Sequence, residues 1–516
     1  MLIVLGAQLA LVRAFGSVTP IWDQWDGEAA YLYKPYLEGS LSPWFVFSPH
    51  NEHRIFFSRA LSLGLLELAG SWDTLLQMAV NAMLHALGAG LLVAALGASL
   101  GCIGFVALAA FASLILSVPY GHENVLAGFQ SPFYFLLLFT FASFLALYRS
   151  RPFSARWWAG ALLALASYLC LASGAFTLLA PAALFMLQAA IRRRRGAVEF
   201  IAILVQVLIV AVLAYFIPRI PDHTVLQAAT FGDFLAAFMV TASWPFADGI
   251  WGVFALHLPV ILLAAWLIAK RAPVDDARWV IVLLAIWLAL QYGCLAIGRS
   301  TSVMAARYLD IYVIAALVNL ASLFHLLEIG RSSRFTKVSL LAASTLWIVA
   351  VTLAAASQVD KAVKGVVDRY ATSISQTTNL KNFLATGDFT QLADKPFMHI
   401  PYPSAERLRD VVSDPTILAV LPSVLIEGHP GPAPPAPAFV LGEGVHHATA
   451  GVKGWLLETG PMFLPLGIAL LFVVAFLRPV LGFSSEVRSS SPADDRRSRP
   501  IEPAELKLFR GTTLRL

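Results

Sequence analysis

The sequence predicts an all-α polytopic membrane protein with about twelve transmembrane helices, a class indicated by its composition, its hydropathy and its long apolar runs. Hydrophobic residues make up 58% of the chain and charged residues only 13%, about half of the roughly 25% that soluble domains carry. The mean hydropathy is +0.74. The apolar runs are continuous rather than alternating, which favours helices over a β-barrel in lipid.

The apolar runs set the predicted topology. They cover residues 1–18, 75–98, 102–118, 131–149, 156–173, 175–191, 198–217, 250–270, 279–297, 307–328, 338–357 and 461–480. Clusters of arginine and lysine separate pairs of runs, at residues 149–156, 192–195, 270–278 and 331–337. Because basic loops stay in the cytoplasm, all clusters face that side. Both the amino and the carboxyl terminus are then cytoplasmic, and the membrane is expected to be the bacterial inner (plasma) membrane.

The first outer loop, residues 19–74, contains an apolar stretch at 55–70. Counting back from the basic clusters keeps this stretch outside the membrane. We therefore interpret it as an amphipathic helix at the outer interface, with a second such helix at 27–38. The other outer loops are expected at residues 119–130, 218–249, 298–306 and 358–460.

The predicted domain organisation follows from this topology. Residues 1–357 form a transmembrane module that includes the long helical first periplasmic loop. The segment 358–460 has ordinary polarity and is predicted to be a small periplasmic domain before the last transmembrane helix, 461–480. The tail, 481–516, is rich in arginine, serine and proline, and is predicted to be cytoplasmic and disordered.

An acidic and aromatic motif directly follows the first predicted helix. It places three carboxylates and two indoles within seven residues, namely Asp23, Asp26, Glu28, Trp22 and Trp25. One interpretation is a solvated loop with an aromatic belt at the membrane surface. The other is a catalytic site, in which a carboxylate takes a proton from an acceptor hydroxyl while the aromatic faces pack on a sugar ring.

A second polar cluster precedes the 55–70 stretch and consists of His50, Asn51, Glu52, His53 and Arg54. It is either a helix-capping cluster or an anion site, in which Arg54 and His53 hold a lipid phosphate. Histidine and glutamate are also metal ligands. Their spacing here matches no strong metal motif, so we expect neither a metal nor another cofactor.

Two further groups of polar residues lie in or beside the predicted outer loops. They are His122, Glu123, Asn124 and Gln130, and then Arg299, Arg307 and Tyr308. One interpretation is that the first group caps helices and that the arginines extend to the membrane interface. In the alternative interpretation both groups line the site, and Arg307 is a second phosphate contact.

Several classes of function are not indicated by the sequence. The sequence contains no Gly-x-x-x-x-Gly-Lys phosphate loop, so an ATP-driven pump is not indicated. Charged residues are scarce inside the apolar runs, where an ion-coupled transporter carries several ionisable groups. The net charge of +5 comes from loop clusters and does not indicate nucleic-acid binding.

In combination, these motifs resemble those of the glycosyltransferase C superfamily of integral membrane enzymes. That superfamily includes bacterial aminoarabinose and mannosyl transferases, which use polyprenyl-phosphate sugars. The stretch from Asp26 to Tyr31 resembles the superfamily's acidic motif and surface helix. Residues 49–57 resemble its Pro-rich aromatic segment near the lipid phosphate, and Arg307-Tyr308-Leu309 resembles its late Arg-Tyr-Leu motif.

The chain departs from the superfamily's pattern at one point. The usual adjacent Asp-Glu pair is Asp26-Gly27-Glu28 here, which leaves the general base open between Asp26 and Asp23. The segment from Tyr402 through Arg407 to Asp414 resembles stretches of related membrane proteins to which no activity is attached.

The resemblance implies an inverting glycosyltransferase acting on the periplasmic face. It would move a sugar from a polyprenyl-phosphate donor to a glycan or glycolipid acceptor of the cell envelope, with an aspartate as general base. Arg54 and Arg307 would stabilise the leaving phosphate. The expected partners are this donor, this acceptor and membrane lipids. Two alternatives stay open: a transporter or flippase of a lipid-linked glycan, and a non-catalytic envelope assembly protein.

Overall fold

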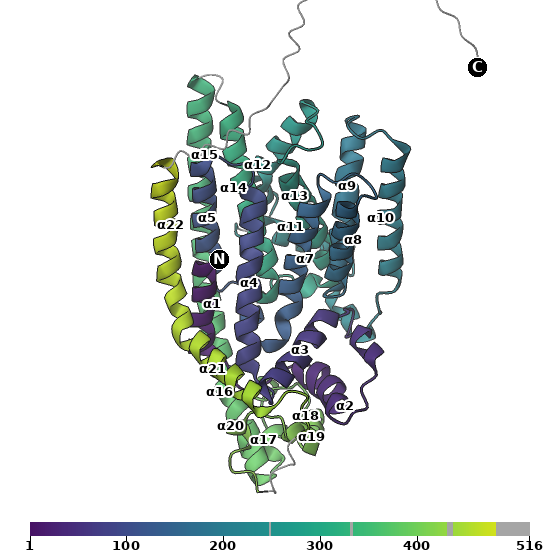
Figure 1. Cartoon of the computed structure of the whole chain (residues 1–516), viewed down its shortest axis with the longest axis vertical. Helices are drawn as coiled ribbons and strands as arrows, with labels where there is room; N and C mark the ends of the chain where they lie inside the picture. The colour runs from purple at the N-terminus through teal and green to yellow at the C-terminus, as the bar shows by residue number, and fades with distance from the viewer. Residues whose placement is uncertain (247–248, 331–333, 431–436, 481–516) are drawn as a thin grey trace, which may run out of the picture.

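The computed structural model describes residues 1–246, 249–330, 334–430 and 437–480, and every regular element in these ranges is helical. The predicted all-α class is therefore confirmed. Figure 1 shows a bundle of long helices with a layer of shorter helices at one end. The predicted disordered tail, 481–516, lies outside the described residues.

Nine helical segments of the described chain are long and apolar enough to cross a membrane. Seven are built on single helices: α4 (Thr74–Gly97), α7 (Ser131–Leu147), α9 (Phe176–Ala190), α10 (Ala197–Tyr215), α12 (Ile250–Ala269), α13 (Trp279–Gly298) and α14 (Ala306–Ile329). Two are built on consecutive pairs: α15 (Arg334–Ser357) with α16 (Val359–Thr386), and α21 (Glu443–Thr459) with α22 (Phe463–Val480).

Four shorter helices complete the bundle: α1 (Leu2–Phe15), α5 (Cys102–Ser117), α8 (Ala155–Tyr168) and α11 (Phe231–Ser243). The first three occupy predicted apolar runs. They are shorter than the ~20 residues that span a bilayer, so the count of about twelve crossings stays a prediction. The sequence places 218–249 in an outer loop, whereas α11 lies within it and packs against α12 and α13.

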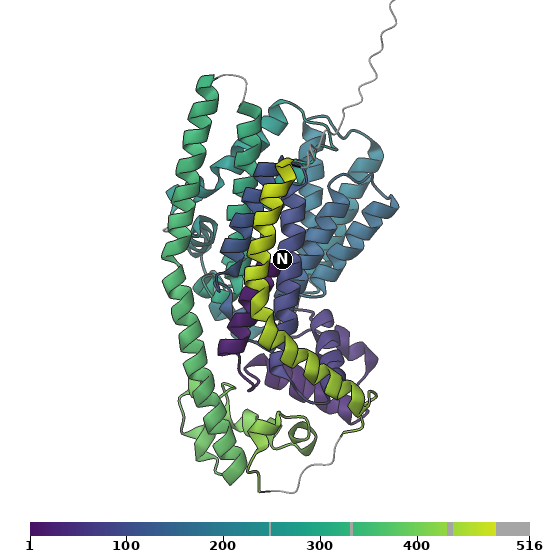
Figure 2. The ribbon, with the colours of Figure 1, turned by 60° about the vertical axis from the view of Figure 1, so that its left-hand side comes forward.

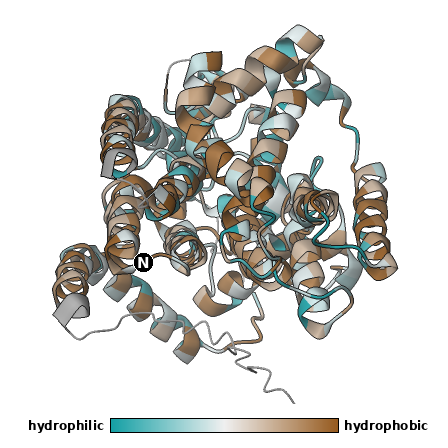
Figure 3. Ribbon diagram, turned by 90° about the horizontal axis from the view of Figure 1, so that it is seen from above, coloured by the Kyte–Doolittle hydropathy of each residue, from teal (hydrophilic) through white to brown (hydrophobic). Residues whose placement is uncertain are grey.

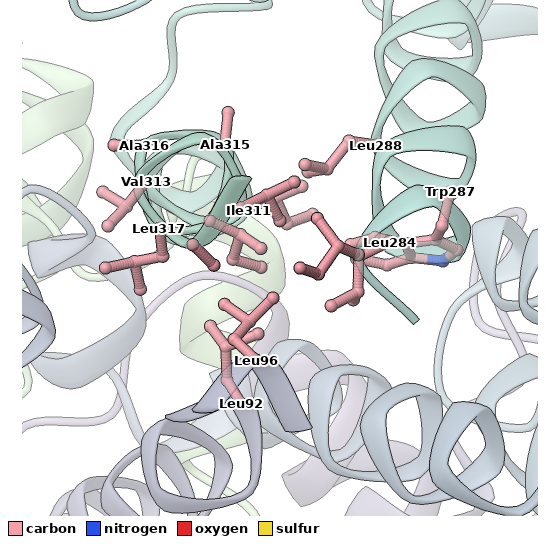
Figure 4. Close-up of a cluster of buried hydrophobic side chains, with 14 of the residues drawn as sticks. Leu92, Leu96, Leu284, Trp287, Leu288, Ile311, Val313, Ala315, Ala316 and Leu317 are labelled. Atoms are coloured by element: carbon pink, nitrogen blue, oxygen red, sulfur yellow. The ribbon is translucent and has the colours of Figure 1, made fainter. Parts of the chain in front are cut away.

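Helix α14 forms the centre of the bundle because it is apolar around most of its circumference and other helices surround it. Leu92 and Leu96 of α4 converge on it from one side, and Leu284 and Leu288 of α13 from another, beside Ile311 (Figure 4). Helices at the rim instead carry hydrophobic residues on their outward surfaces (Figure 3), the distribution expected of helices surrounded by lipid.

The basic clusters gather at one end of the bundle. Arg194 donates a hydrogen bond to the carbonyl of Ser150 at 3.5 Å, and Arg193 donates to the carbonyl of Arg271. These contacts bring three of the predicted basic loops together. The fourth cluster, 331–337, lies partly outside the described residues. The first loop and most of the segment 358–460 lie at the opposite end (Figure 1).

The layer at this opposite end, here called the outer layer, is built from two distant parts of the chain. The first loop forms the π-helix η1 (Gln24–Tyr33), α2 (Lys34–Leu37), the 3₁₀-helix η2 (Pro43–Phe47) and α3 (Phe56–Ala69). The segment 358–460 contributes α17 (Thr390–Ala393), α18 (Ala405–Val412), α19 (Pro415–Leu418) and α20 (Ser423–Ile426). Helices therefore occupy both stretches predicted to be helical, 27–38 and 55–70.

One apolar core serves both parts of the outer layer. Trp25, Leu66 and Trp72 of the first loop are buried in one cluster with Leu408 and Leu425 of the segment 358–460. Figure 2 shows that α15 and α16 run as one long line from the bundle into the outer layer, and that α21 bends away from α22 to lie along it. The outer layer is thus closed by hydrophobic packing as well as by the chain's connections.

Two adjacent residues of α20 allow the shared core to be tested. Leu425 is completely buried, whereas Val424 is 41% exposed. Leu425→Ala is expected to lower the free energy of unfolding by about 2–5 kcal/mol, because it leaves a cavity in this core. Val424→Ala should change it by less than about 1 kcal/mol. Thermal unfolding of the protein in detergent measures both. Equal effects of the two variants would contradict the shared core.

Candidate functional site

The acidic motif lies on η1, a π-helix whose i→i+5 hydrogen bonds bring residues five apart near one face. Glu28 and Tyr33 share a face, and both accept a hydrogen bond from α4. Asp26 and Tyr31 share another face, and Arg407 of α18 contacts both of them. The carboxylates of the motif therefore point into different surroundings.

Asp26 is held in an ion pair with the segment 358–460. Arg407 donates from Nε and Nη2 to Asp26 Oδ1 at 2.9 and 2.7 Å, and the hydroxyl of Tyr402 donates to Asp26 Oδ2. Burial, together with this hydrogen bond, raises the pKa of Tyr402, so the hydroxyl keeps its proton. Both oxygens of Asp26 are committed to joining the two parts of the outer layer.

Glu28 is fully buried and surrounded by hydrogen-bond donors. Its donors, at 2.5–3.1 Å, are the side chains of Ser62, Gln24, Gln77 and Trp72. Burial raises the pKa of Glu28, and the four hydrogen bonds oppose that shift. A carboxylate with this environment fixes η1 against α3 and α4, and no face of it is open to a substrate.

Asp23 is the open carboxylate of the motif. Its side chain is 54% exposed, and its Oδ2 lies 3.9 Å from His50 Nε2. Partial burial would raise the pKa of Asp23, but the nearby His50 outweighs it, with help from the positive charge of Arg307 and from His53. The pKa of Asp23 is therefore held below its ordinary value, and the group is ionised at neutral pH.

The two histidines of the 49–54 cluster are fixed by their surroundings. The backbones of His50 and His53 exchange two hydrogen bonds, which closes a tight turn. The ring of His50 packs edge-on against Phe129 at 5.2 Å, and its buried Nε2 has no hydrogen-bond partner among the described residues. His53 Nδ1 accepts from the backbone N–H of Ala172, and burial lowers the pKa of His53 to about 4.

Glu52 joins three outer segments. It accepts hydrogen bonds from Arg299 Nη2 at 3.0 and 3.1 Å and pairs with His223 Nδ1 at 2.5 Å. Burial would raise the pKa of Glu52, but the hydrogen bonds from Arg299 and His223 lower it to about 2. The predicted site residues Glu52 and Arg299 thus lie together, in an ion-pair cluster that ties the 49–54 turn to the loops 218–230 and 298–305.

Arg54 and Asn51 lie at the edge of this turn. Arg54 donates to the carbonyl of Phe47 at 3.0 Å, and Asn51 is exposed at the tip of the turn with a φ of 51°. The neighbouring Arg59 is buried and donates to the carbonyls of Phe45, Val46 and Ser48. Arg59 therefore fixes the 43–48 segment, while Arg54 keeps part of its guanidinium available.

The third polar group meets the outer end of α14. Arg307 Nη1 donates to Glu123 at 3.3 Å, and buried Asn124 donates to the Arg307 carbonyl at 2.8 Å. The ring of His122 packs against Gly365 of α16, and burial lowers the pKa of this histidine. His122, Glu123 and Asn124 lie on the helical turn α6 (His122–Val125), and Arg307 links this turn to the Asp23 region.

The remaining predicted residues divide between exposed and buried positions. The ring of Trp22 is exposed next to Asp23, on a backbone with a φ of 50°. Trp25 is buried and donates to the carbonyl of Pro20, so its ring is not a platform for a ligand. Tyr308 is buried against Phe133, and Gln130 stands at the N-cap position of α7, where its side chain makes no capping hydrogen bond.

The structure therefore brings Asp23, His50, Arg307, Glu123 and Trp22 to one region of the outer layer, with His53 and His122 at its edge. It separates Asp26, Glu28 and the Glu52–Arg299 pair from this region. We call the first set the Asp23 site. Within the described ranges no three His, Cys, Asp or Glu side chains are grouped as metal ligands.

Sequence reasoning missed the partners that decide these roles. Arg407 and Tyr402 occupy a segment whose motif was visible, yet no spacing in the sequence indicated that they hold Asp26. Gln77 and Ser62 looked like ordinary polar residues of apolar helices. Arg369 of α16 was also missed: it donates to Gln376 at 3.2 Å and adds a second positive charge near Glu123.

Comparison of the chain with protein-family models, with curated proteins and with solved structures finds no match to any of them.

The low pKa of Glu52 predicts that its contribution to stability depends on pH. Its ordinary pKa is 4.5 and its pKa here is about 2, so the stabilisation is complete above pH 4.5 and is lost as the pH falls towards 2. Glu52→Gln should therefore lower stability by up to about 3 kcal/mol at neutral pH and by much less near pH 3.

Thermal unfolding in detergent at several pH values measures this difference. The control is Glu427→Gln, which alters a glutamate that is 75% exposed and whose contact with Lys381 is loose. Its effect should be small at every pH. A Glu52→Gln effect that does not shrink on acidification would contradict the ion-pair cluster.

Proposed function

We propose that this protein is a membrane glycosyltransferase, which moves a sugar from a polyprenyl-phosphate donor to a cell-envelope acceptor, with Asp23 as general base. The observation that carries this proposal is that the three carboxylates have different surroundings. Asp26 and Glu28 are saturated by protein donors, whereas Asp23 is exposed and ionised beside a cation and an aromatic ring. The resemblance of the motifs to the glycosyltransferase C superfamily supports it.

In the proposed reaction Asp23 accepts the proton of the acceptor hydroxyl. The acceptor oxygen forms a bond to the anomeric carbon of the donor sugar while the bond from that carbon to the phosphate oxygen breaks. The electron pair of the broken bond leaves on the lipid phosphate, and the configuration at the anomeric carbon inverts. The ring of His50 lies 3.9 Å from Asp23, and exposed Trp22 offers a ring face for a sugar.

Arg307 is the residue best placed for the leaving phosphate. Its charge acts on Asp23, and its ion pair with Glu123, at 3.3 Å with both side chains more than a third exposed, is loose enough to exchange for a phosphate. Positive charge placed where negative charge develops is commonly the largest catalytic contribution. Arg54, at the membrane edge of the 49–54 turn, is a second contact in this proposal.

The proposed topology has about twelve crossings, with the basic end of the bundle and both termini in the cytoplasm. The outer layer then lies in the periplasm of the bacterial inner membrane. An active site there has no access to nucleotide sugars, which is consistent with a lipid-linked donor. The three basic loops that meet at the far end support this orientation.

The test of the base is mass spectrometry of envelope glycans from cells that lack the protein and are complemented with variants. Asp23→Asn should reduce sugar transfer by about 100- to 10,000-fold, because the carboxylate that accepts the proton is gone. Asp26→Asn should instead lower thermal stability, since Arg407 and Tyr402 lose a charged acceptor.

Undiminished sugar transfer by Asp23→Asn would contradict the proposed mechanism. Loss of transfer in Asp26→Asn with intact stability would assign the base to Asp26. Translocation of a lipid-linked glycan without any change in its mass would favour a flippase over a transferase.

The phosphate contact is tested by Arg307→Gln. This variant should lose about 100- to 1,000-fold in transfer, because one group that stabilises the developing charge is removed. Arg151→Gln is the control, since Arg151 is an exposed arginine in a basic loop at the other end of the bundle. Rates are measured in proteoliposomes supplied with the polyprenyl-phosphate sugar. Equal rates for the two variants would place the phosphate elsewhere.

A further inference from the structure

A pocket opens on the surface of the outer layer, where η1 passes into α2 and the chain continues to η2. Its volume is about 380 Å³, within the range of about 300–1,000 Å³ that small-molecule sites occupy. Helix α2 lies at the edge of the outer layer (Figure 1), so the pocket is open to the surroundings of the protein. No residue of the Asp23 site lines the pocket. Its polar and aromatic lining consists of Tyr31, Lys34, Glu38, Ser40, Ser42 and Phe45.

Two aromatic rings contribute to the wall of this pocket, and each is held by an arginine. The guanidinium of Arg407 lies 5.6 Å from the ring centroid of Tyr31, and that of Arg59 lies 4.7 Å from the ring centroid of Phe45. Neither arginine lines the pocket, so both rings are fixed from outside it. Tyr31 is nevertheless 52% exposed. Fixed and accessible aromatic rings are suited to packing against the C–H faces of a sugar ring.

The charges that line the pocket are balanced by the protein itself. Lys34 Nζ lies 3.9 Å from Glu38 Oε1 and donates a hydrogen bond to Asp414 of the segment 358–460. The hydrogen bond to Asp414 raises the pKa of Lys34, so the ammonium group stays charged. An anionic ligand would have to compete with two carboxylates for this one cation. The pocket therefore does not favour a phosphate or an acidic sugar.

We propose that this pocket binds a neutral saccharide, with its rings against Tyr31 and Phe45 and its hydroxyls on the polar lining. The ammonium group of Lys34 is a donor, the carboxylate of Glu38 is an acceptor, and the exposed serine hydroxyls are both. A saccharide offers the matching combination of hydroxyl groups and apolar C–H faces. An acyl chain would instead remove the polar lining from water without offering it hydrogen bonds, which is costly.

The pocket also has a place in the proposed reaction. Asp23 occupies the N-cap position of η1, and Tyr31 lies near the other end of this ten-residue helix. The two sites therefore belong to one element of the outer layer. An acceptor glycan bound in the pocket by its neutral sugars could then extend along η1 and present a hydroxyl to Asp23. This acceptor role rests on the proposed function, whereas saccharide binding does not.

Binding is measured with the full-length protein in lipid nanodiscs, on an array of neutral and acidic bacterial oligosaccharides of defined structure. Nanodiscs avoid maltoside detergents, whose sugar headgroups would compete for the pocket. The wild type should bind neutral members of the array. Tyr31→Ala should weaken this binding by about tenfold or more, because an aromatic wall of the pocket is lost. Phe397→Ala is the matched control, since Phe397 is 58% exposed and does not line the pocket.

Charge reversal gives a gain of binding that a misfolded variant cannot produce. Glu38→Lys removes one of the two carboxylates near Lys34 and adds a cation, so the preference should move from neutral to acidic oligosaccharides. Glu427→Lys reverses an exposed charge that does not line the pocket and should keep the neutral preference. The proposal is overturned if the wild type binds no member of the array or prefers acidic ones. It is also overturned if Tyr31→Ala binds as the wild type does, or if Glu38→Lys leaves the preference unchanged.

The acceptor role is read separately from kinetics, with the oligosaccharide that binds most tightly on the array as acceptor. Tyr31→Ala should raise the KM for this acceptor and leave kcat near the wild-type value, because it weakens binding without removing the base. Asp23→Asn should bind the array as the wild type does while losing transfer. An unchanged KM in Tyr31→Ala would overturn the acceptor role. Saccharide binding by a wild type that transfers no sugar would reject the proposed function and support the saccharide site alone.

Discussion

The buried carboxylate of Glu28 is the constraint on which the outer layer depends. Placing a charge in an apolar interior costs several kcal/mol unless donors surround it, and here four side chains from η1, α3, α4 and the turn before α4 provide them. Once Glu28 is buried among these donors, the π-helical register directs Asp26 towards Arg407. It leaves Asp23 at the exposed start of the helix. The choice of an available carboxylate is thus a consequence of how another carboxylate is buried.

The two ends of the molecule are stabilised by different interactions. At the basic end, arginines cap helix carbonyls and join loops. At the other end, aromatic and aliphatic residues from the first loop and from residues 380–425 form a common core, as in a small soluble protein. Between them, α14 is enclosed by other helices, so a polar side chain on it must find a partner inside the bundle. Asn124 meets this need for Asp310 and at the same time holds the start of α14.

Residues at the Asp23 site come from regions that only the fold brings together. Asp23 and His50 belong to one loop, but Arg307 belongs to α14. Arg369, whose charge acts on Glu123, belongs to α16, which enters the outer layer as a continuation of α15. The continuous line of α15 and α16 is important because it connects these regions. It carries the chain from the bundle to the segment that supplies Arg407 and Tyr402, and these two residues bind both oxygens of Asp26. The carboxylates of one motif therefore have different surroundings, which are set by contacts with residues hundreds of positions away.

The sequence by itself determined the all-helical membrane class, the positions of the basic loops and the helical stretches of the first loop. These features follow from local composition, since apolar length and charge placement act within a few dozen residues. It also located the acidic motif, but it did not show which of its carboxylates is exposed. That depends on which side chain meets Arg407 and which meets solvent, and hydrogen bonds between distant segments leave no periodic trace in a sequence. Only the tertiary structure decided it, by burying Glu28, pairing Asp26 and leaving Asp23 exposed beside His50.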